Sequence, residues 1–189
     1  MRQPLVNLVL AALAEDIGHH DLTTYATVPE DARCEARLIA KQDGVLSGIL
    51  PFRMAFKKMR AKMRNWESKS DGDRVTAGDI VASFSGRTRA VLAGERTAMN
   101  FIQHLSGVAT LTAQFVATVA DLDCRVADTR KTTPMLRELE KAAVKHGGGA
   151  SHRHSLESGV LLKEHQITAA GGLTSHLKRA RPYGAHPVP

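Results

Sequence analysis

Cationic side chains follow apolar or glycine-rich segments at three places in the second half of the chain. They are Arg130 and Lys131 after an apolar pair, His152 and Arg153 after a glycine run, and Lys163 after three aliphatic residues. An α/β scaffold that gathers cations at successive strand ends forms a pocket for an anionic small molecule. The pattern therefore predicts a binding site for a small acidic substrate.

The first of these places carries two cations of different chemistry. The guanidinium of Arg130 offers a planar fork for a carboxylate, whereas the ammonium of Lys131 is a compact partner for a phosphate. Thr129 precedes them, and Thr132 and Thr133 follow, so hydroxyl donors surround the pair. These residues suit a substrate that carries both a carboxylate and a phosphate. The competing interpretation is that both cations lie on a solvated loop.

The second and third places add further candidates. A triple glycine at 147–149 lets a ligand approach the backbone closely, directly before His152 and Arg153. His152 has only His154 at a spacing that suggests a shared metal ion, which argues against a metal site. Lys163 ends a predicted buried strand, and a buried lysine needs an anionic partner. A Schiff-base role for Lys163 is the alternative.

Arg96 is a separate candidate at the start of a predicted helix. It follows Glu95, whose carboxylate suits the positive end of a helix, whereas the helix dipole does not favour a cation there. Arg96 is therefore predicted to act as an anion hook, which could reach across an oligomer interface. The alternative is an ordinary surface ion pair.

The overall composition limits the class of protein. The 189 residues are 43% hydrophobic and 24% charged, which is typical of a globular protein. The net charge of +7 favours an acidic partner, but aromatic residues make up only 4% and no basic stripe alternates with them, so a nucleic-acid binder is not expected. Without an apolar run of roughly 18 residues or a leader, the chain is predicted to be cytoplasmic and not membrane-bound. Cys34 and Cys124 are predicted to be buried thiols.

The periodicity predicts an α+β front and a βα rear. In the front we expect helices at 5–15 and 48–62, a strand at 36–41 and short strands with tight turns between 71 and 89. In the rear we expect helices at 92–105, 111–119, 135–145 and 173–181, with Gly107 ending the first, and strands at 125–128 and 160–163. The predicted domains are residues 1–105 and 106–189.

Several long runs closely resemble the quinolinate phosphoribosyltransferase family. They are residues 94–110, 128–134, 147–149, 152–153 and 162–164, with further likeness at 15–18 and 21–24. The resemblance implies a front α+β domain followed by part of an open α/β barrel, the type II phosphoribosyltransferase fold. It also implies a homodimer or hexamer in which the front domain of one subunit closes the barrel site of another.

The resemblance also implies the reaction and the residues that carry it. The family transfers phosphoribosyl from phosphoribosyl pyrophosphate to quinolinate with loss of carbon dioxide, giving nicotinate mononucleotide for de novo NAD biosynthesis. The implied quinolinate contacts are Arg130, His152, Arg153 and Lys163, with Arg96 from the neighbouring subunit and further contacts from Thr129 and Lys131. Lys131, nearer the phosphoribosyl pyrophosphate, and Lys163 are the implied catalytic residues. Mg²⁺ is implied with the pyrophosphate substrate, and its carboxylate contacts are expected beyond residue 189.

The chain departs from the family pattern at several points. Met135 stands in place of a glycine, residues 154–156 replace a Leu-Gly-Leu type run, and residues 164–166 replace Glu-Asn-His. The family pattern continues past Pro189, so we expect a fragment or truncated product. Two alternatives stay open: a molybdate-transport-associated relative of unsettled substrate, against which Lys163-Glu164 argues, and a non-catalytic fragment that binds a dicarboxylate.

Overall fold

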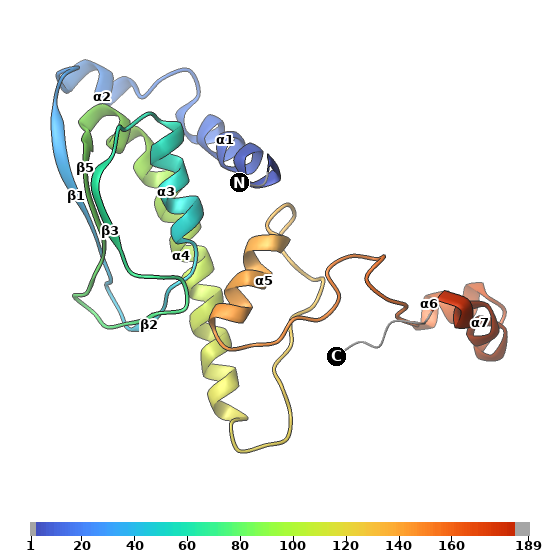
Figure 1. Ribbon diagram of the computed structural model, residues 1–189. Helices are drawn as coiled ribbons and strands as arrows, with labels where there is room; N and C mark the ends of the chain where they lie inside the picture. Colours follow the sequence, from blue (N-terminus) through green and yellow to red (C-terminus); the bar gives the residue numbers. More distant parts are fainter. Residues whose placement is uncertain (1–2, 184–189) are drawn as a thin grey trace.

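The computed structural model describes residues 3–183 (Figure 1). Its elements in chain order are α1 (Gln3–Ile17), α2 (Leu22–Thr27), β1 (Arg33–Ile39), β2 (Gly44–Val45), α3 (Ile49–Lys58), β3 (Arg64–Ser68), β4 (Arg74–Val75), β5 (Ile80–Arg87), α4 (Thr88–Thr118), α5 (Arg137–His146), α6 (Glu164–Ala169), α7 (Leu173–Ala180) and the 3₁₀ turn η1 (Arg181–Tyr183). Figure 1 shows α6 and α7 standing apart from the helices and strands that precede them.

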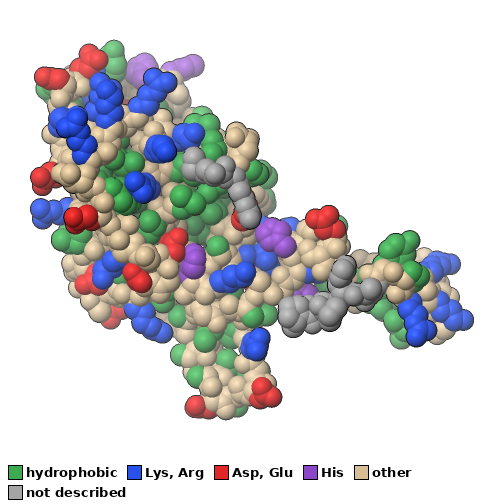
Figure 2. Space-filling model, viewed as in Figure 1, with side chains coloured by type: hydrophobic (Ala, Val, Ile, Leu, Met, Phe, Trp, Pro, Cys, Tyr) green, Lys and Arg blue, Asp and Glu red, His purple; other side chains and the backbone are tan. Residues whose placement is uncertain are grey.

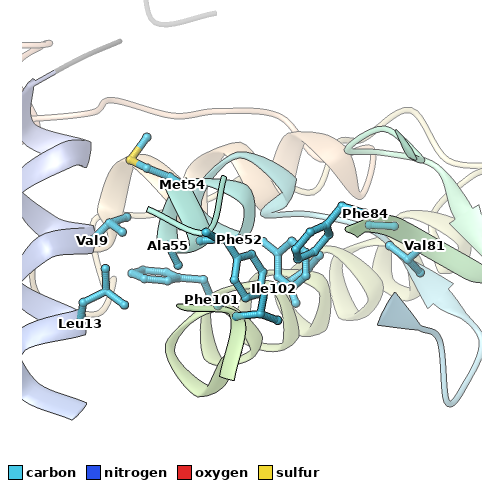
Figure 3. Packing of buried hydrophobic residues seen from close by; sticks show 14 of the residues in the cluster. Val9, Leu13, Phe52, Met54, Ala55, Val81, Phe84, Phe101 and Ile102 are labelled. Atoms are coloured by element: carbon cyan, nitrogen blue, oxygen red, sulfur yellow. The ribbon is translucent and has the colours of Figure 1, made fainter. Parts of the chain in front are cut away.

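The front half is an antiparallel sheet covered by helices. Its strands lie in the order β1-β5-β3, and β2 and β4 form a separate antiparallel pair. Buried and less buried side chains alternate along most of β5, as expected for a strand with one face on a core. That core joins α1, α3 and α4 to the sheet through residues that include Val9, Phe52, Phe84, Phe101 and Ile102 (Figure 3).

A single long helix, α4, replaces the two helices predicted on either side of Gly107. It runs without a break from Thr88 to Thr118. A glycine inside a helix costs at most roughly 1 kcal/mol, and neighbours such as Leu105 and Ala109 are buried and hold the helix in place. The predicted domain boundary at 105/106 falls within this helix and stays a prediction.

Other predicted elements of the front are confirmed with shifted ends. The helix predicted at 48–62 ends at Lys58, because Arg60 and Lys62 have positive φ angles, which lie outside the right-handed helical region. The strand predicted at 36–41 lies at Arg33–Ile39, while the short helix α2 was not predicted. The prediction of buried thiols was wrong for Cys124, which is exposed, and Cys34 is only partly buried.

The two predicted rear strands are the main correction to the fold. At 125–128 only an isolated parallel bridge forms, between Ala127 and Ala150, and residues 160–163 are not a strand. A strand exists only where a neighbour pairs with its backbone along several residues. In the part of the chain that the structure describes, these segments have no such neighbour beyond the single bridge. The helix α6 that follows was not predicted.

The triple glycine after α5 packs against α4, not against an open ligand site as predicted. A Cβ atom on Gly147 would lie 2.3 Å from the carbonyl oxygen of Ala109, and one on Gly149 would lie 3.0 Å from Thr112 Cγ2, both on α4. Both distances are shorter than a normal contact. Glycines at 147 and 149 therefore let the end of α5 approach α4 closely.

Replacing Gly147 with alanine is expected to lower the free energy of unfolding by about 1–3 kcal/mol, the usual cost of overpacking. The backbone of Gly147 has φ −77°, which alanine adopts freely, so the cost is steric. Gly107→Ala is the matched control, because an added Cβ there meets nothing within 4 Å and should stabilise the helix by up to roughly 1 kcal/mol. Urea denaturation of both variants tests this, and equal effects would contradict it.

Candidate anion-binding site

Two of the predicted cationic segments are joined by the parallel bridge between Ala127 and Ala150. The amide of Ala150 donates to the carbonyl of Val126 at 2.8 Å, and the amide of Asp128 donates to the carbonyl of Ala150 at 3.0 Å. Because the two backbones run in the same direction, the residues that follow them leave at the same edge. The segments beginning at Thr129 and at Ser151 are therefore neighbours.

A buried ion pair between Asp128 and Lys141 fastens the two segments to α5. Their side chains are only 4% and 5% exposed. The carboxylate of Asp128 also accepts from the hydroxyl of Ser151 at 2.9 Å and from the amide of His152 at 2.8 Å. The ammonium of Lys141 donates further to the carbonyl of His152 at 3.2 Å. The charges thus satisfy each other and orient the backbone that carries His152 and Arg153.

Arg137, on the same helix, holds the other segment. Its guanidinium donates to the hydroxyl of Thr132 at 3.2 Å, to the carbonyl of His154 at 3.4 Å and to the carbonyl of Arg130 at 3.5 Å. The first turn of α5 therefore contacts both loops, and α5 is the element that positions the site.

Arg130 is the predicted cation whose side chain has a buried hydrogen-bond donor without a partner in the described chain. Its Nε atom is buried and has no hydrogen-bond partner among residues 3–183. Leaving a buried donor unpaired costs on the order of 1–3 kcal/mol, and more for a charged group. A carboxylate in front of this guanidinium would satisfy it, so the observation favours an anionic ligand here.

The remaining candidate residues of the two segments are exposed or half-buried. Thr129 and Lys131 are exposed, and the hydroxyl of Thr129 accepts from the amide of Lys131 at 3.1 Å. His152 is half-buried, and Arg153 is half-buried with its guanidinium donating to the carbonyl of Gly159 at 3.2 Å. The structure therefore brings together the two segments that carry these four residues and Arg130.

Lys163 and Arg96 lie on other parts of the described chain. Lys163 is exposed and directly precedes α6, so the argument that burial demands an anionic partner was wrong for it. Arg96 is exposed on α4, eight residues before His104 and thus about 12 Å nearer the start of that helix. The predicted roles of both residues stay predictions.

Glu140 connects the site loop to α4. Its carboxylate, nearly buried, accepts from His104 Nε2 at 2.8 Å and from the amide of Thr133 at 3.0 Å. Burial alone would raise the pKa of Glu140, but the hydrogen bonds from Thr133 and His104 outweigh it and hold the pKa below its usual value. The ionised carboxylate is therefore the form that the fold favours.

Because the folded-state pKa of Glu140 is lowered, its contribution to stability is present above the ordinary glutamate pKa of 4.5 and is lost as the pH falls through the folded-state pKa. We expect Glu140→Gln to reduce stability at pH 7 and to have a smaller effect at pH 3.5. Denaturant unfolding across this range measures the difference between the two proteins. A difference that grows toward acid pH would contradict the assignment.

The described residues do not fit a resident metal ion. Within residues 3–183 no group of three or more His, Cys, Asp or Glu side chains is placed to hold one. We therefore derive no step through the predicted Mg²⁺. Across the same residues, no helix is both long and apolar enough to cross a membrane.

The fold and the site together define a type II phosphoribosyltransferase-like α/β protein, as predicted. Residues 21–106 match the N-terminal domain of quinolinate phosphoribosyl transferase, and residues 108–188 match the C-terminal domain of the same enzyme. The chain therefore belongs to the quinolinate phosphoribosyl transferase family.

Curated relatives agree with this assignment. The chain is 40% identical over 174 residues to a probable nicotinate-nucleotide pyrophosphorylase (carboxylating) of Bacillus subtilis, which covers 92% of this chain and 60% of the relative. It is 39% identical over 176 residues to a protein of the same description from Synechocystis, covering 93% and 59%. The chain thus spans about 60% of the length of these relatives.

Solved structures share the fold. NadC from Streptococcus pyogenes superposes with a TM-score of 0.87 at 40% identity, covering 94% of this chain and 63% of that one. The nicotinate-nucleotide pyrophosphorylase of Ehrlichia chaffeensis gives a TM-score of 0.89 at 33% identity, covering 96% and 66%. The fold class predicted from the sequence is confirmed.

Proposed function

We propose that this protein transfers the phosphoribosyl group of phosphoribosyl pyrophosphate to quinolinate, releasing pyrophosphate and carbon dioxide and forming nicotinate mononucleotide. The reaction is a step of de novo NAD biosynthesis. Membership of the family and the names of its relatives support the proposal. The structural observation that carries it is the buried Nε of Arg130, which has no hydrogen-bond partner among residues 3–183.

In this proposal the two carboxylates of quinolinate are held by Arg130, His152 and Arg153, with Thr129 as a further contact. The buried Asp128–Lys141 pair fixes the backbone on which these residues stand, so the cations are oriented before the substrate arrives. Lys131, exposed at the outer side of the loop, binds the phosphoribosyl pyrophosphate. Its compact charge suits a phosphate.

The chemistry follows from this placement of charge. The pyridine nitrogen attacks carbon 1 of the ribose, and the bond from that carbon to pyrophosphate breaks, its electron pair leaving with the pyrophosphate. Because the transition state is cation-like at the sugar, the enzyme accelerates the reaction mainly by orienting the two substrates and by stabilising the departing pyrophosphate. The bond from the ring to the 2-carboxylate then breaks. Carbon dioxide leaves, and the electron pair stays at the ring carbon, which takes a proton.

The proposal includes two further residues, one from a neighbouring subunit and one from the segment that precedes α6. Arg96, exposed on α4, reaches the site of a neighbouring subunit in a homodimer or hexamer, and Lys163 approaches the substrate as the second catalytic lysine. The compartment is proposed to be the cytoplasm. Plant relatives carry chloroplastic and mitochondrial names.

The test is formation of nicotinate mononucleotide from quinolinate, phosphoribosyl pyrophosphate and Mg²⁺, with carbon dioxide release measured in parallel. We expect one carbon dioxide per product and a loss of at least about tenfold in rate for Lys131→Ala. Lys145→Ala is the matched control, because Lys145 is exposed on α5 and should leave the rate unchanged. Absence of product, or equal losses in both variants, would contradict the proposal.

A further inference from the structure

A basic concavity lies in the front half, on other elements than the site described above. It has a volume of about 500 Å³ and is lined on one side by α3 and on the other by the turn that follows it. Volumes of this size hold small ligands in other proteins. Figure 2 shows Lys and Arg side chains gathered over the upper part of the molecule in this view, where α3 and the sheet lie.

The concavity is formed by one helix face and one turn. Leu50, Arg53 and Lys57 recur along α3 at spacings of three and four residues, which places them on a single face. Arg60 and Lys62 come from the turn, and both have positive φ angles, 56° and 49°. Few non-glycine residues adopt this conformation. The turn thus directs two cations back toward the helix face.

The charge of the lining is entirely positive. Four cations line it and no acidic side chain does. Among residues 3–183, none of these four cations forms an ion pair or a side-chain hydrogen bond with the protein. Four like charges around one hollow repel each other, and an anion within it would relieve the repulsion. Leu50 and Met63 add an apolar wall.

We propose that this concavity binds a small ligand bearing several phosphate groups, through Arg53, Lys57, Arg60 and Lys62. The ligand needs several charged groups, because contact with one exposed cation adds little affinity in water. Only a ligand that contacts all four cations gains substantial affinity. The apolar wall suits a ligand that joins its phosphates to an apolar group. The site is independent of the proposed enzymatic function, since it shares no residue with the cationic segments around Arg130.

The single tryptophan of the chain reports on this site. The guanidinium of Arg53 lies 4.8 Å from the ring centroid of Trp66, and the indole is only partly buried. A ligand that draws Arg53 toward the concavity changes this contact, so Trp66 fluorescence should change on binding. Inorganic tripolyphosphate is the probe, because it carries several charges and does not absorb at the wavelengths used.

The experiment is titration of the full chain with tripolyphosphate at fixed ionic strength, followed by Trp66 fluorescence and by calorimetry. We expect a saturable response that weakens at least tenfold in K57E/R60E. The control R37E/R74E makes the same change in net charge at exposed positions elsewhere and should bind as the parent does. Lys57→Gln, which leaves the turn intact, should also weaken binding and guards against misfolding of the double variant.

Any of four outcomes would overturn the proposal. A response that does not saturate, or one that falls equally in both double variants, would indicate only general attraction to a basic protein. Saturable binding that is lost in R130A/K131A and kept in K57E/R60E would assign the phosphate to the other site. Binding that calorimetry detects without a change in Trp66 fluorescence would place the ligand away from Arg53 and Trp66.

Discussion

Replacing Lys141 with methionine is expected to lower the free energy of unfolding by about 3–5 kcal/mol, the usual cost of removing one partner of a buried ion pair. The carboxylate of Asp128 is 4% exposed and would keep only its bonds from Ser151 and His152. The carbonyl of His152 would lose its donor as well. The effect is measured by urea denaturation at pH 7.

Two further variants make this result specific. Lys145→Met removes an exposed lysine from the same helix and should change stability by no more than about 0.5 kcal/mol. The double variant Asp128→Asn with Lys141→Met removes both charges and should recover part of the loss, because no unpaired charge then stays buried. A single-variant loss below about 1 kcal/mol would show that the pair does not stabilise the fold.

Replacing Arg130 with alanine is expected to weaken quinolinate binding by roughly 30- to 100-fold, which corresponds to about 2–3 kcal/mol. The guanidinium has a buried Nε without a hydrogen-bond partner in the described part of the chain, and a carboxylate would accept from it and from a neighbouring nitrogen at once. Arg130→Lys keeps the charge but loses the fork, so we expect it to recover only part of the affinity. Calorimetric titration of each variant measures the change.

The control for this series is Arg125→Ala. Arg125 is exposed and lies before the bridge at Ala127, so it precedes the site along the same segment. Its removal alters the net charge as Arg130→Ala does, but should leave the affinity for quinolinate within a factor of two or so of the parent value. Equal losses at 125 and 130 would mean that general attraction, and not the guanidinium of Arg130, holds the ligand.

The elements of the fold that local patterns encode could be predicted from the sequence. The apolar spacing at 5–15 and 48–62 and the turn residues between 71 and 89 predicted α1, α3, β4 and β5 with shifted ends, whereas α2 and β3 were not predicted. Gly107 misled the prediction, because a glycine was taken as a helix end where packing of α4 overrides its weak preference. The prediction of the two rear strands was wrong for a different reason. An aliphatic run such as 160–162 forms a strand only if a partner strand lies beside it.

The candidate site was predicted in part. The candidate residues at 129–131 and 152–153 were identified by type, and the parallel bridge joins the two segments that carry them. The residues that orient them, Arg137, Glu140 and Lys141, were missed. Their spacing of three and four on a predicted helix places three charged side chains on one face, and that signal was present. The partners of that face, such as Asp128, could not be found without the tertiary structure.

The measurement that tests the central claim most directly is a calorimetric comparison of quinolinate with nicotinate, which lacks one of the two carboxylates. If cations from the two segments joined at Ala127 and Ala150 hold both carboxylates, quinolinate should bind saturably and at least tenfold more tightly than nicotinate. Arg130→Ala should remove most of that preference. Equal affinity for the two ligands, or a preference that survives the loss of Arg130, would contradict the account.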